Sequence, residues 1–97
     1  MTEINTIGFI GLGVMGEPMC GHLARRSGKT VLAYDLRPEP AERLREFGVQ
    51  PATMQEIAAK AQVILMSLPD GKAMSAVVSA LEPHLRAGQC VVDTSTS

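Results

Sequence analysis

The chain has 97 residues, with nine Lys and Arg against ten Asp and Glu, a formal net charge of −1 and 45% hydrophobic residues. A chain of this length can bury about 60–70% of the surface that its unfolded state exposes, which suffices for one hydrophobic core. The length therefore predicts one small globular domain over residues 1–97 and excludes a two-domain enzyme within them. The balanced charge and the few aromatic residues, Phe9, Tyr34 and Phe47, argue against a surface that binds nucleic acid or anionic lipid.

Cys20 and Cys90 each lack a second cysteine or a histidine at the spacing of common zinc sites. We expect both to be small buried apolar residues in a reducing compartment, and we expect no metal site. The N-terminal segment lacks the basic and apolar regions of a secretory signal. The longest apolar run, residues 63–66, is far shorter than the ~20 residues of a membrane span. These features predict a soluble, cytoplasmic protein with no membrane partner.

Apolar runs and helical patterns alternate along the chain. The predicted strands are residues 6–10, 30–34, 49–50, 62–68 and 90–92. The first predicted helix begins after a glycine-rich turn and reaches about residue 26. Three further predicted helices cover residues 39–47, 53–60 and 71–81. Thr53 and Glu56 form a capping box at the start of the third helix. The run at 62–68 is apolar nearly throughout, which suits a parallel strand covered by helices on both faces.

This order of strands and helices with short connections predicts a doubly wound α/β fold. Such a fold has a parallel sheet, here of about five strands, joined by right-handed crossovers. No repeat, low-complexity tract or linker interrupts the pattern. The chain stops directly after the last predicted strand, without the helix that should cover it.

Gly11-Leu12-Gly13-Val14-Met15-Gly16 matches the pattern G-x-G-x-x-G between the first predicted strand and the first predicted helix. This context is the one in which the pattern binds a dinucleotide. Gly11 permits a tight turn, Gly13 leaves room for a pyrophosphate, and Gly16 lets the helix pack closely on the sheet. Backbone N–H groups and the positive end of the helix dipole would hold the phosphates without basic side chains.

Asp35 directly follows the second predicted strand. A carboxylate there can accept hydrogen bonds from both ribose hydroxyls of NAD and repels the 2′-phosphate of NADP. The alternative is that Asp35 only starts a turn and that the glycines only mark a loop. Arg37 complicates the choice between NAD and NADP, because it can stack on adenine, reach a 2′-phosphate or remain solvated. The pattern favours NAD over NADP.

The stretch IGFIGLGVMGEPMCGHL, residues 7–23, closely resembles the opening signature of the β-hydroxyacid dehydrogenases. This is the family of 3-hydroxyisobutyrate dehydrogenase and tartronate semialdehyde reductase, whose Rossmann NAD(P)-binding domain is similar to that of 6-phosphogluconate dehydrogenase. The spacing of Met15, Gly16 and Met19 is more specific than the glycines alone. Leu68-Pro69 and the closing segment VVDTSTS match later landmarks, so the resemblance covers the whole chain.

The resemblance implies further contacts beyond the glycine loop. Leu36 would join Asp35 at the cofactor, and Leu68 and Pro69 would line its ribose and nicotinamide side. Thr96 would contact the cofactor near the nicotinamide and Ser95 the substrate, because hydroxyl groups can donate or accept around an amide or a carboxylate. Alternatively, Leu68 is a core residue, Pro69 ends a strand and the final residues form a polar tail.

Some positions depart from the family pattern. Asp35-Leu36 stands where members that use NADPH often have Asn-Arg, which shifts the preference toward NAD. Gly13 stands where the 6-phosphogluconate dehydrogenases usually have Ala, which disfavours that branch. Ala73 replaces an Asn that contacts the cofactor in some members, and we assign no catalysis to His22, which replaces a frequent Asn.

The family's catalytic lysine, a glycine-rich substrate segment and an all-helical dimerising domain lie beyond the position of Ser97. The resemblance therefore implies a cofactor-binding domain of a longer homo-oligomeric oxidoreductase, with no catalytic residue in this chain and no activity of the chain alone. The intact enzyme would transfer hydride between NAD and the β-carbon of a short 3-hydroxy acid. The alternatives are an imine or semialdehyde reductase of the same superfamily and a non-catalytic dinucleotide-binding module.

Overall fold

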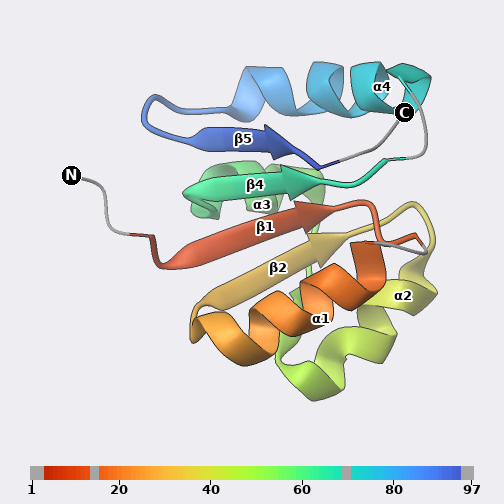
Figure 1. The fold of residues 1–97 in the computed structure, drawn as a ribbon. Helices are drawn as coiled ribbons and strands as arrows, with labels where there is room; N and C mark the ends of the chain where they lie inside the picture. The colour runs from red at the N-terminus through yellow and green to blue at the C-terminus, as the bar shows by residue number, and fades with distance from the viewer. Residues whose placement is uncertain (1–3, 14–15, 69–70, 95–97) are drawn as a thin grey trace.

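A computed structural model describes residues 4–13, 16–68 and 71–94. Within them, five parallel strands form one sheet in the order β3-β2-β1-β4-β5 (Figure 1). The strands are β1 (Thr6–Ile10), β2 (Thr30–Tyr34), β3 (Val49–Pro51), β4 (Val63–Met66) and β5 (Cys90–Asp93). The helices are α1 (Gly16–Ser27), α2 (Pro38–Arg43), α3 (Met54–Lys60) and α4 (Gly71–Leu81), with 3₁₀ turns η1 (Leu44–Phe47) and η2 (Glu82–His84). The predicted doubly wound α/β fold is confirmed.

The predicted helix at 39–47 is divided into α2 and the 3₁₀ turn η1. The backbone tightens at its end because Gly48, in the left-handed conformation at φ 93°, donates its N–H to the Arg45 carbonyl oxygen at 3.0 Å. Leu44 faces inward as predicted and is 3% exposed, and Phe47 packs against the same core. The capping box of α3 is also confirmed, with Thr53 and Glu56 exchanging hydrogen bonds of 3.0 and 3.1 Å.

The sheet separates two hydrophobic clusters. Neighbouring residues of a strand point to opposite faces, so Phe9 and Ile10 of β1 belong to different clusters. One cluster packs under α1, α2 and η1, and its members include Phe9, Cys20, Val31, Leu44 and Val49. The other packs under α3 and α4, and its members include Ile10, Leu32, Ile57, Ile64 and Leu81.

The strand predicted at 62–68 is shorter in the structure and is not buried on both faces. Ile64 and Met66 of β4 are buried, whereas Val63 and Leu65 are half-buried. The reason is that α1, α2 and η1 pack mainly on β2 and β3 and leave this face of β4 more open. Among the described residues, no helix is long and apolar enough to cross a bilayer.

The prediction that both cysteines are buried is correct for Cys20 and wrong for Cys90. Cys20 lies in the core under α1, where burial raises the pKa of its thiol to about 12. Cys90 is exposed because it starts β5, an edge strand against which no helix of the described residues packs closely, and all residues of the strand are exposed, including Val91 and Val92. The sequence pattern identifies the apolar residues of β5 but does not show which helices pack against the strand.

Close packing of α3 on β1 depends on Gly8. A Cβ atom at this position would overlap Ile57 Cγ2 and lie 3.3 Å from the Ala61 Cβ. Ile57 is fully buried in the second hydrophobic cluster. The absence of a side chain at Gly8 therefore sets the distance between α3 and the sheet.

We expect Gly8→Ala to lower the free energy of unfolding by about 1–3 kcal/mol, the usual cost of overpacking a core. Gly71→Ala is the matched control, because a Cβ atom there would meet nothing within 4 Å and alanine favours a helix. Urea denaturation of both variants and the unmodified protein measures the effect. Equal stability of the two variants would contradict this packing.

Candidate cofactor-binding site

The glycine loop and Asp35 meet at the carboxyl edge of the sheet. Ile10, the last residue of β1, pairs with Tyr34, the last residue of β2, so the segments that follow both strands leave the sheet side by side (Figure 1). The Gly11 N–H extends this pairing by donating to the Tyr34 carbonyl oxygen at 2.9 Å. Ligands of open parallel α/β sheets bind beyond this edge.

Two of the three glycines are required by the fold. Gly11 has φ +96°, and a Cβ atom there would overlap the Ser67 carbonyl oxygen and lie 2.9 Å from Leu68 Cδ2. A Cβ atom at Gly16 would overlap the carbonyl oxygen of Gly11, because α1 begins almost in contact with the end of β1. Gly11 thus makes the turn, and Gly16 allows the close approach of helix and loop, as the sequence pattern predicts.

Gly13 differs from both of these positions. A Cβ atom there would meet nothing within 4 Å, so neither packing nor backbone strain in this structure requires a glycine. The residue is exposed and faces open space beside the start of α1. The open space allows a ligand to approach the backbone closely at this point, and a dinucleotide pyrophosphate fits this property of the loop.

Asp35 holds the glycine loop directly. Its Oδ2 accepts a hydrogen bond from the Leu12 backbone N–H at 2.7 Å, and its Oδ1 accepts one from the Arg37 backbone N–H at 2.9 Å. The Arg37 Nε lies 3.6 Å from Oδ1. Two backbone donors therefore orient the carboxylate, and each oxygen keeps a further lone pair for a ligand.

The remaining predicted residues are distributed around this centre. Leu36 is 90% exposed, and the Arg37 side chain is 67% exposed, so both stand at the surface next to Asp35. Leu68 is half-buried, packs against the second core cluster and approaches Gly11. It therefore serves the core and also lies beside the loop. Five predicted residues lie outside the described part of the chain, namely Val14, Met15, Pro69, Ser95 and Thr96.

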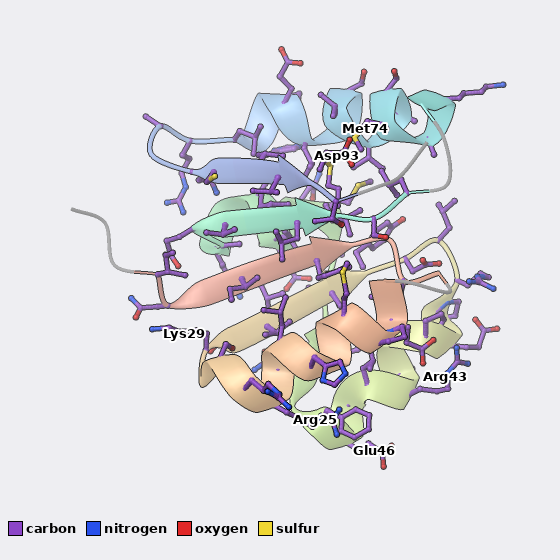
Figure 2. All side chains as sticks on the ribbon, viewed as in Figure 1. Arg25, Lys29, Arg43, Glu46, Met74 and Asp93 are labelled. Carbon is purple, nitrogen blue, oxygen red and sulfur yellow. The ribbon has the colours of Figure 1, made fainter. Side chains whose placement is uncertain are left out.

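A cleft of about 460 Å³ begins at Leu12 and Gly13 and continues between α1 and the α2–η1 segment. Its polar lining includes Glu17 of α1 and Arg43 of α2, the latter labelled in Figure 2. Arg43 Nη2 lies 2.7 Å from Glu17 Oε1, and Arg43 Nε lies 2.9 Å from Glu17 Oε2. These hydrogen bonds with Arg43 lower the pKa of the Glu17 carboxyl.

The contact between Glu17 and Arg43 cannot be predicted from the sequence, because no local pattern links side chains from two separate helices. The signals available are an acidic residue in the first turn of α1 and a cluster of charges in α2, which also fit an ordinary solvated surface. No group of three or more His, Cys, Asp or Glu side chains that could hold a metal ion occurs in the described ranges.

Comparisons with known proteins identify the family of the chain. Residues 6–97 match the family model of the NAD binding domain of 6-phosphogluconate dehydrogenase. The chain is 33% identical over 102 residues to mitochondrial 3-hydroxyisobutyrate dehydrogenase of Mus musculus, a match that covers 99% of this chain and 30% of the relative. The chain thus spans about 30% of the length of the first curated relatives that it matches.

Solved structures share the fold. A Mycobacterium tuberculosis 3-hydroxyisobutyrate dehydrogenase with L-serine superposes with a TM-score of 0.88 at 30% identity, over 97% of this chain and 32% of that one. Psf3 in complex with NADP⁺ and 2-OPP gives a TM-score of 0.86 at 30% identity, over 94% and 34% of the two chains. The family match over residues 6–97 and this shared fold show that the chain belongs to the family of the 6-phosphogluconate dehydrogenase NAD-binding domain, as an NAD(P)-binding Rossmann domain of the hydroxyacid dehydrogenases.

Proposed function

We propose that residues 1–97 are the cofactor-binding domain of an oxidoreductase that uses NAD to interconvert a short 3-hydroxy acid and its carbonyl form. The observation that carries the proposal is the open space at Gly13 beside a carboxylate that the same loop holds in place. When bound, the nicotinamide ring carries the hydride, and the protein supplies position and electrostatics.

Backbone groups of the loop at residues 11–16 would bind the pyrophosphate. The loop contains no basic residue, and it leads into α1, a helix of 12 residues whose positive dipole end favours an anion. Gly13 lets the phosphates approach, while Gly11 and Gly16 keep the loop against the sheet. Leu12, Val14 and Met15 complete the proposed loop contacts.

Asp35 would accept the hydroxyls of the adenine-side ribose. Its two oxygens are already oriented by Leu12 and Arg37, so a ribose would meet a carboxylate that needs little reorganisation. The negative charge of Asp35 disfavours a 2′-phosphate, which makes NAD the preferred cofactor and NADP the weaker one. Leu36 and Arg37, both exposed, would flank the adenosine.

The nicotinamide side of the site is proposed from the family resemblance. Leu68 lies next to Gly11, which supports a place for it along the cofactor. The roles of Pro69 and Thr96 toward the cofactor and of Ser95 toward the substrate follow from the resemblance alone. The substrate would be a short 3-hydroxy acid, held in part by the Ser95 hydroxyl.

The general acid of the reaction would come from residues outside this chain. Lys29 precedes β2 and lies at the edge of the sheet opposite the glycine loop (Figure 2). Lys60 ends α3 just before β4, at the same opposite edge, and no motif around Lys72 predicts catalysis. A general acid must lie within hydrogen-bond reach of the reacting oxygen. We propose that a helical domain supplies it and also forms a homo-oligomer.

We expect Gly13→Val to lower the affinity for NAD at least tenfold, because the side chain would occupy the space proposed for the pyrophosphate. The melting temperature should stay within about 2 °C of the unmodified value, because a Cβ atom at Gly13 meets nothing within 4 Å. Gly16→Ala is the contrasting control and should lower the melting temperature clearly. Isothermal titration and thermal melting measure both effects, and normal NAD binding by Gly13→Val would refute the loop assignment.

The unmodified protein should bind NAD more tightly than NADP. We expect Asp35→Ala to weaken NAD binding about tenfold, because the ribose loses a charged acceptor and the Leu12 N–H loses its partner. Asp35→Asn removes the charge but keeps one oxygen acceptor, and it should reduce the discrimination against NADP with a smaller loss of NAD affinity. Parallel titrations with the two cofactors provide the measurement, and preference of the unmodified protein for NADP would refute the role of Asp35.

A further inference from the structure

Glu17 and Arg43 connect α1 and α2 across the cleft that begins at the glycine loop. The carboxylate accepts two hydrogen bonds from one guanidinium group, a geometry stronger and more specific than a single contact. The Glu17 side chain is 26% exposed and the Arg43 side chain 59% exposed. The pair is therefore a defined feature of the cleft wall that remains accessible to a ligand.

The position of the cleft relates this pair to the proposed ribose site. Asp35 does not line the cleft itself, but its carboxylate accepts the Leu12 N–H and lies 3.6 Å from the Arg37 Nε, and Leu12 and Arg37 both line the cleft. The carboxylate is therefore next to the start of the cleft. A ribose accepted by Asp35 would present its 2′ position at this opening. A phosphate attached there would be near two of the cations that line the cleft, Arg37 and Arg43. A third, Arg25, lies two turns further along α1 and packs over the Phe47 ring.

The charges around the opening cancel. Asp35 and Glu17 contribute two negative charges, and Arg37 and Arg43 contribute two positive charges. Glu17 lies close enough to respond to the other three, because Arg43 lowers the pKa of its carboxyl most, Arg37 lowers it further and Asp35 raises it. A 2′-phosphate thus meets a site with no net positive charge.

We propose that Glu17 is a cofactor-specificity residue, which disfavours NADP by occupying the guanidinium of Arg43 and by adding a negative charge at the cleft opening. The inference rests on the proposed binding of NAD at the loop and Asp35. Binding of NAD does not require Arg43, because backbone groups would hold its pyrophosphate. Loss of Glu17 would free Arg43 for the 2′-phosphate, and guanidinium groups bind phosphate well.

The decisive variant is Glu17→Ala, and the chain offers a matched control. Glu42 pairs with Arg45 at 2.7 Å, both side chains are more than half exposed, and neither lines the cleft. Glu42→Ala therefore removes the same charge from a nearby helix without opening the cleft pair. The double variant Glu17→Ala with Arg43→Ala tests whether any gain acts through the guanidinium.

Dissociation constants for NAD and NADP are measured by titration of each purified variant at one low salt concentration, since salt screens such effects. We expect Glu17→Ala to raise the affinity for NADP relative to NAD about tenfold, the size of one charge-assisted hydrogen bond at a partly exposed site. Glu42→Ala should leave the ratio unchanged, and the double variant should return it close to the unmodified value. Thermal melting confirms that each variant is folded.

An unchanged ratio in Glu17→Ala, with NAD binding intact, would overturn the specificity role while leaving the proposed function in place. A shift of the same size in Glu42→Ala or in the double variant would also overturn it, because the effect would then not act through Arg43. Failure of the unmodified protein to bind NAD would instead overturn the proposed function, and the inference with it.

Discussion

The close approach of backbone to backbone at the glycine loop is the constraint on which this structure depends. The chain leaves β1, passes the end of β4 and enters α1 with no space for a side chain at Gly11 or Gly16. A Cβ atom at Gly11 would overlap the backbone that follows β4, and one at Gly16 would force α1 away from the loop. Because α1 is held this close, its first turn lies at the carboxyl edge, beside Asp35. Packing of the fold and placement of the candidate site thus have one cause.

Asp35, which follows β2, is bound to the same loop after β1. Through Oδ2 it binds the backbone of the loop, and through Oδ1 it closes its own turn at Arg37. The structural role and the proposed binding role of this residue are therefore not alternatives, since the bonds that hold the carboxylate also orient it. Ordering the acceptor during folding, rather than on binding, reduces the entropy that a ligand must offset.

The features that sequence patterns predict correctly are local. The spacing of apolar residues identifies the strands, and the positions of the glycines and the Thr53 capping box identify the loop and the helix ends. Each of these signals depends on neighbours within a few residues. Cys90 is predicted wrongly, since its exposure depends on which helices pack on β5, and none of the described ones packs closely there. Glu17 and Arg43 are missed because their contact exists only after two helices pack side by side.

The nearly neutral composition has a consequence for how such a site chooses its ligand. The phosphates would be held by backbone dipoles, so the charged side chains nearby are free to act on selectivity. At the start of the cleft Arg37 faces Asp35 and Arg43 faces Glu17, and such a pair of opposite charges contributes little net charge until one partner is removed. The guanidinium group of Arg43 can therefore bind an anion only when its ion pair with Glu17 is absent. A single substitution in α1 can then alter cofactor preference while the glycine loop and its packing remain unchanged.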